Sequence, residues 1–140
     1  MKKAVVSLIA VSLLIAITLP ATAFEVKNVT VIPSNNGILV KVNYSLDPIT
    51  ALKVFLFGAK TIENDVLSIF NTTENFTIIR IGYSSAEFLF PAEKCENLTY
   101  FLGVNLSVPV NLSIYSNAGS QVNIGCVSKI PPMYFYNNLS

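Results

Sequence analysis

A chain of 140 residues is long enough for one domain, and its charged residues make up only 12% of it, about half of what is usual. Nine Lys and Arg residues balance eight Asp and Glu residues, so the chain has neither the basic field that nucleic-acid binding needs nor an acidic tail. Histidine is absent, which removes the commonest general base and most metal sites.

The first residues have the pattern of a signal peptide. A short basic start precedes an apolar stretch, Ala4–Leu19, which is followed by Pro20 and the small-residue triplet Ala21–Ala23. This stretch is about 16 residues long, shorter than the roughly 20 that a spanning helix needs. We expect residues 1–23 to be cleaved as a signal peptide and residues 24–140 to form one secreted or cell-surface domain. No membrane span is expected after cleavage.

The remaining chain has the pattern of short strands. Apolar and polar residues alternate with a period of two, which predicts strands that bury one face. The expected strands are residues 24–32, 38–46, 51–57, 76–83, 88–90, 98–114, 121–127 and 133–136. Residues 61–70 are the only segment expected to form a helical turn. Seven to eight short strands without a long helix predict an all-β fold, an immunoglobulin-like β-sandwich.

Three of these segments carry finer expectations. Residues 51–57 are apolar on both faces, which indicates a central strand. The run 98–114 buries its even-numbered residues and is too long for one strand, so it should bend near Gly103 or Pro109. The apolar residues of 24–32 change phase along the segment, which predicts a bulge near Asn28.

Asparagine supplies the polarity that charged residues do not. Residues 24–140 contain 14 asparagines, and eight of them stand in Asn-x-Ser/Thr sequons where chance gives roughly two. They are Asn28, Asn43, Asn71, Asn75, Asn97, Asn105, Asn111 and Asn138. An oligosaccharyltransferase needs a side-chain amide with a hydroxyl two residues on, in a reachable segment. On the alternating run the sequons occupy the polar face, so we expect N-linked glycans that point away from the core.

The two cysteines, Cys95 and Cys126, are expected to form a disulfide, because two cysteines in an exported chain pair by default. Closing the loop between Cys95 and Cys126 would stabilise the folded state by roughly 3–4 kcal/mol. A metal pair and a redox pair are the alternatives. Two thiols without histidine make a poor zinc site, and the chain has no Cys-x-x-Cys motif.

Candidate catalytic groups are few. The carboxylate pairs Glu63 with Asp65 and Glu93 with Glu96 have the residue types of glycosidase-like acid and base catalysis, although solvated loop charges explain them more simply. No phosphate-binding glycine loop or nucleophile elbow is present in the sequence. We therefore expect no enzyme, no cofactor and no bound metal.

The export signal, the low charge, the Asn-, Ser-, Thr- and Tyr-rich strands and the crowded sequons resemble secreted surface glycoproteins of thermophilic archaea. That family includes subunits of threads and pili, whose β-sandwiches assemble by donating a terminal strand to a neighbour. The likeness implies a structural or interaction protein of the cell surface that associates with itself or with other surface proteins. A monomeric secreted binding or adhesion module is the alternative. The basic start and Val5–Ala10 also resemble archaeal type IV pilins, which implies a pilin-like subunit if the apolar segment is retained.

Overall fold

The computed structural model describes residues 24–72 and 74–136, so the expected signal peptide and the Asn138 sequon lie outside the described residues. Within these ranges strand is the main element, and the all-β class is confirmed at this coarse level. The elements are β1 (Phe24–Ser34), β2 (Gly37–Leu46), α2 (Pro48–Phe57), η1 (Ala59–Ile62), α3 (Glu63–Leu67), β3 (Phe70–Asn71), β4 (Thr77–Ile81), β5 (Ser85–Phe90), β6 (Glu93–Cys95), β7 (Leu98–Phe101), β8 (Val104–Tyr115), β9 (Gln121–Ile130) and β10 (Met133–Tyr136). No helix in the described ranges combines the length and the hydropathy that crossing a bilayer requires.

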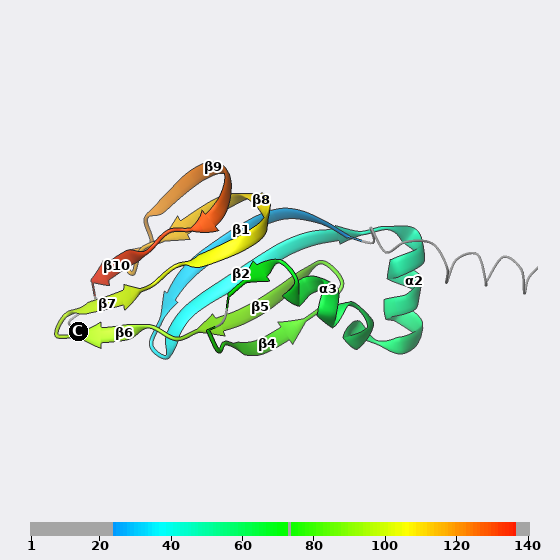
Figure 1. Ribbon diagram of the computed structural model, residues 1–140, viewed down its shortest axis with the longest axis horizontal. Coiled ribbons are helices and arrows are strands. Elements are labelled where there is room, and N and C mark those ends of the chain that lie inside the picture. The colour runs from blue at the N-terminus through cyan, green and yellow to red at the C-terminus, as the bar shows by residue number, and fades with distance from the viewer. Residues whose placement is uncertain (1–23, 73, 137–140) are drawn as a thin grey trace, which may run out of the picture.

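Seven strands form one large sheet of order β3-β8-β1-β2-β5-β4, with β9 paired to β8 as well. Neighbouring strands are antiparallel except β1 and β8, which are parallel. Figure 1 shows β1, β2 and β5 running side by side along the molecule. The register of β1 against β2 shifts between Val26 and Asn28, which confirms the expected bulge.

One apolar core lies against the inner face of this sheet. The wholly buried apolar residues of its central strands β1, β2 and β5 are Val29, Val31, Ile38, Val40, Val42, Ala86, Phe88 and Phe90. Phe70 contacts Phe88 and Phe90 edge to face, with ring centroids 5.0 and 5.2 Å apart. Such contacts contribute about 0.5–1.5 kcal/mol per pair beyond burial. Phe70 lies in β3, a short strand that the sequence did not predict.

A hairpin ribbon links the large sheet to a small sheet of order β10-β7-β6. β8 pairs with β9 in the large sheet, and their continuations β7 and β10 pair in the small one. The ribbon changes sheets where Leu102 and Gly103 lie opposite Pro131 and Pro132. Gly103 has a φ of 83°, and a Cβ there would lie 2.8 Å from the Pro132 nitrogen. The bend expected near Gly103 is confirmed, and glycine is the residue that fits it.

The side chains that are buried change from even-numbered to odd-numbered residues at this bend, the kink of the ribbon at Gly103. In β8 the even-numbered Val104 and Leu106 are buried, as expected, whereas in β7 the odd-numbered Thr99 and Phe101 are buried. The expectation of one buried face from residue 98 to residue 114 is therefore wrong for β7. The reason is that the kink shifts the ribbon by one residue, which moves every side chain of β7 to the other face.

The central strand expected at residues 51–57 is wrong, because this segment belongs to α2 (Figure 1). Asp47 is its N-cap and accepts a hydrogen bond from the Thr50 backbone nitrogen at 2.7 Å. Pro48 occupies the first turn, where its missing N–H has no helical partner to lose. Gly58, with a φ of 88°, ends the helix. The helical turn expected within 61–70 is confirmed by α3 and the end of η1.

The structure does not show the expected disulfide, because Cys95 and Cys126 are both free and exposed in it, and the pairing stays a prediction. Cys95 ends β6 in the small sheet, and Cys126 lies in β9 of the large sheet. The rule that pairs two cysteines in an exported chain takes no account of where the strands lie. Here the topology assigns the two thiols to different sheets.

Candidate functional site

Seven of the eight sequon asparagines fall within the described residues, and five of these are exposed. The exposed ones are Asn71, Asn75, Asn97, Asn105 and Asn111. Asn105 and Asn111 alternate with buried residues of β8, which confirms that they face away from the core. An exposed side-chain amide on such a face is accessible to a transferase and leaves room for a glycan.

Asn28 and Asn43 differ from the exposed five, because they are half-buried and paired with each other. They lie directly opposite in the register of β1 and β2. The Asn43 Nδ2 donates a hydrogen bond to the Asn28 Oδ1 at 2.6 Å. Opposite residues of an antiparallel pair have Cβ atoms about 4.5–5.5 Å apart, so a glycan on one asparagine would occupy the space beside the other.

Three sequon asparagines lie at neighbouring positions on the adjacent strands β2, β1 and β8, on the outer face of the large sheet. Val29 of β1 pairs with Leu112 of β8, and Asn28 and Asn111 are the residues that immediately precede this pair on the two strands. Asn43 lies on the other side of Asn28. The sheet thus gathers asparagines that are far apart in the sequence into one polar row.

A second pair of sequons lies at the start of β8, where Asn71 of β3 is opposite Asn105. A groove of about 400 Å³ adjoins this pair. Its lining residues are Asn71, Thr72, Glu74, Leu102, Gly103, Val104, Asn105 and Lys129. Neither Glu74 nor Lys129 was predicted from the sequence as a site residue. No local signal could have found them, because the strand pairing that joins their segments is long-range.

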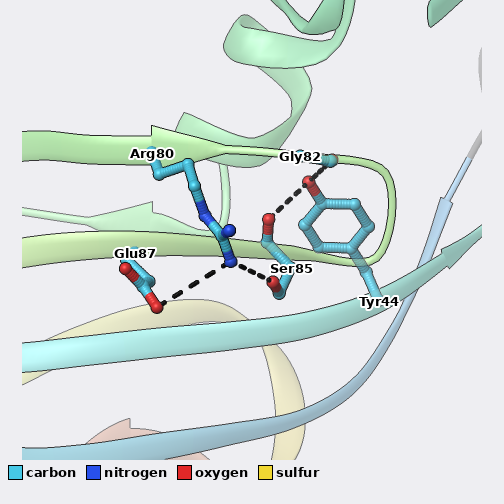
Figure 2. Close-up of polar contacts among 5 residues, drawn as sticks. All are labelled: Tyr44, Arg80, Gly82, Ser85 and Glu87. Carbon is cyan, nitrogen blue, oxygen red and sulfur yellow. Dashed lines mark hydrogen bonds and ion pairs between the residues drawn. The ribbon is translucent and has the colours of Figure 1, made fainter. Parts of the chain in front are cut away.

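One polar cluster joins β2 to the turn between β4 and β5. Figure 2 shows the Tyr44 hydroxyl pointing at the turn, where it donates to the Gly82 carbonyl oxygen and lies 3.3 Å from the Ser85 carbonyl oxygen. Arg80 donates to the Ser85 hydroxyl at 3.3 Å and lies 3.9 Å from the Glu87 carboxylate. The Arg80 side chain is mostly exposed, so this ion pair contributes little to stability.

Burial raises the pKa of Tyr44 above its ordinary value of 10.0, against the lowering effects of its bond to Gly82 and of the nearby Arg80 charge. The Tyr44 phenol therefore stays protonated at physiological pH and acts as a hydrogen-bond donor. Its partners are backbone carbonyls, so the cluster fastens the turn to the sheet. The arrangement pairs no nucleophile with a base.

The two candidate carboxylate pairs occupy exposed or half-buried positions. Glu63 and Asp65 both lie in α3, two residues apart, so they do not share a helix face. Glu93 is exposed in β6, and Glu96 stands in the following turn with a φ of 53°. Across residues 24–72 and 74–136, no group of three or more Cys, Asp or Glu side chains gathers that could hold a metal ion.

No protein family model, curated protein or solved structure matches this chain.

Proposed function

We propose that this chain is a secreted, N-glycosylated structural or interaction protein of the cell surface. The observation that carries the proposal is the exposure of five sequon asparagines on a chain with only 12% charged residues. A surface so poor in charge needs another source of solubility, and glycans supply it. The proposal includes no catalytic role and no cofactor.

Glycopeptide mapping of protein from the producing cell tests this function. We expect hexose-containing adducts on most of Asn71, Asn75, Asn97, Asn105 and Asn111. Replacing the sequon hydroxyl, as in Ser107→Ala, should remove the adduct from Asn105 alone. A native protein whose mass equals that of the bare polypeptide would contradict the proposal.

A filament subunit is the form of this function that we favour. What supports it is the resemblance to thread and pilus subunits, together with an edge strand, β4, that exposes Ile78 and Ile79. Strand donation stays a prediction. Because β1 lies between β2 and β8 of its own sheet, donation would have to be an exchange between identical subunits. Size-exclusion chromatography and negative-stain microscopy of native material test the assembly, and a uniform monomer would rule it out.

A monomeric binding or adhesion module is the second candidate. The polar groove beside Asn71 and Asn105, with the Lys129 cation and the Glu74 carboxylate in its lining, favours it.

An immunoglobulin-like sandwich also stays a prediction, and the antiparallel β1, β2, β5 and β4 strands over one core are what supports it. N-terminal sequencing separates the secreted form, which begins at Phe24, from a pilin-like form that retains the apolar segment.

A further inference from the structure

Helix α2 exposes an unusual amount of apolar side chain. Of its ten residues only Thr50 and Val54 are buried. The α2 apolar surface consists of the exposed residues Ile49, Leu52, Phe55, Leu56 and Phe57. Phe55 and Phe57 are 74% and 72% exposed. A helix that is apolar on nearly every side is normally buried in a core or in lipid, so this surface requires a partner.

The position of α2 points to a bilayer. Phe24, the first described residue, pairs with Leu46, and α2 begins two residues later at Pro48. Figure 1 shows α2 at the end of the molecule where β1 begins. The apolar stretch Ala4–Leu19 precedes Phe24 closely in the sequence. In the proposed export this stretch would enter the membrane, so α2 would belong to the end of the domain that emerges next to lipid.

The charges around α2 are two lysines and one carboxylate, because Asp47 caps the N-terminus of the helix and is exposed there. The helix contains no acidic residue, and its single charged residue is the half-buried Lys53. Lys60 is the next cation along the chain and is exposed. Lysines beside an apolar helix extend toward headgroups while the apolar side chains enter the acyl region.

A second copy of the chain fits this surface less well. A ten-residue helix is about 15 Å long, and its five exposed side chains offer much less area than the roughly 800 Å² per partner of a stable interface. A symmetric dimer through α2 would also bring the two Lys53 charges toward each other.

We propose that the α2 apolar surface inserts into the outer surface of a lipid bilayer and holds the domain at the membrane. The helix lies in the interfacial plane with Thr50 and Val54 toward the protein and the apolar surface toward the acyl chains. This inference rests on the proposed export, and it deepens that function by naming lipid as the partner that keeps a cleaved protein at the cell surface.

Vesicle flotation tests the inference, using the form of the protein that begins at Phe24. The buried core cluster lies entirely within residues 29–135, so this form retains it, and residues 1–23 cannot themselves cause binding. The probes are neutral phosphatidylcholine vesicles and vesicles with about 30% phosphatidylglycerol, a fraction that gives the surface a negative potential. We expect wild-type protein to float with both and more strongly with the anionic set.

The decisive variant is the double substitution Phe55→Ser with Phe57→Ser, which removes exposed rings only. We expect it to lower the vesicle-bound fraction at least about tenfold, because the variant lacks the two apolar rings whose burial in lipid favours binding. The matched control is Val122→Ser with Tyr136→Ser, two residues that are 58% and 78% exposed in β9 and β10. The control should float like wild type, and thermal unfolding of all three proteins should agree.

Three outcomes would overturn the inference: wild-type protein that does not float, a double variant that floats like wild type, and a wild-type dimer that the double variant dissociates. The last would identify a second copy as the partner. Because flotation does not depend on glycosylation, its failure is separate from a failure of glycopeptide mapping. Flotation therefore tests membrane binding alone, and glycopeptide mapping tests glycosylation alone.

Discussion

The smallest informative unit of this molecule is the Asn28–Asn43 pair on the outer face of the large sheet. Both asparagines stand in sequons, and their side chains are hydrogen-bonded at 2.6 Å. Two glycans on directly opposite residues would overlap at their first sugars. We expect each molecule to carry a glycan on at most one of the two, and mass spectrometry of intact β1–β2 peptides measures this. A doubly modified peptide as the main species would contradict it.

Tyr44 is the residue whose protonation should alter stability. Since burial raises its pKa above 10.0, the folded chain keeps a proton that the unfolded chain has released at alkaline pH. The free energy of unfolding should therefore be at its full value below about pH 10 and fall as pH rises through the folded pKa. Urea unfolding between about pH 8 and pH 11 measures this fall.

Tyr44→Phe tests the same residue by removing its hydroxyl. We expect the variant to lose about 1 kcal/mol at neutral pH, because the Gly82 carbonyl loses its donor. The variant should also show a weaker alkaline loss of stability than wild type. Equal alkaline slopes in the two proteins would mean that Tyr44 is not the group responsible.

At the scale of elements, Gly103 fixes the kink of the ribbon between the two sheets. Gly103→Ala would strain a φ of 83° and press a Cβ against the Pro132 nitrogen at 2.8 Å. We expect a loss of about 2–4 kcal/mol, measured by chemical unfolding. Gly119→Ala is the matched control, because its φ is 86° but no atom lies within 4 Å of the added Cβ. That control should lose only about 1–2 kcal/mol, and equal losses would show that the close approach is unimportant.

Elements that alternate against one buried face could be predicted from the sequence, as β2 and β8 were. Helix α2 could not be recognised by periodicity, because a segment that is apolar on every side resembles a buried strand. Its capping signals were nevertheless present: Asp47 before Pro48, Thr50 three residues after the cap, and Gly58 at the end. Local capping chemistry was the better guide here, since the apolar residues of α2 do not face the protein core.

The individual residues of the candidate site could be predicted from the sequence, but which of them lie together could not. Sequons can be read directly from the sequence, and alternation predicted the exposure of Asn105 and Asn111. The pairing of Asn71 with Asn105 depends on the register between β3 and β8, which no local pattern specifies. The placement of Cys95 and Cys126 could not be predicted for the same reason, because it depends on the two different sheets that carry β6 and β9.

At the scale of the whole molecule, the large sheet depends on β1. This strand pairs with β2 on one side and β8 on the other, and its Val29 and Val31 are wholly buried. Removal of β1 would expose the apolar core against which Val29 and Val31 pack, and would leave the β2 and β8 edges without hydrogen-bond partners. Filament assembly by strand exchange would require a neighbour to restore all of these contacts.

A chain that begins at Asn35 tests this dependence. We expect it to lose cooperative unfolding and near-ultraviolet dichroism, and to regain both when a synthetic peptide of residues 24–34 is added. A control peptide with Val29→Ser and Val31→Ser should fail to restore them, because it carries the β1 backbone without its two buried side chains. Rescue by the native peptide alone would mean that β1 is transferable between chains, as strand exchange requires. A truncated chain that melts like wild type without any peptide would mean instead that β1 adds nothing to the core, and donation of this strand would have no free energy to drive it.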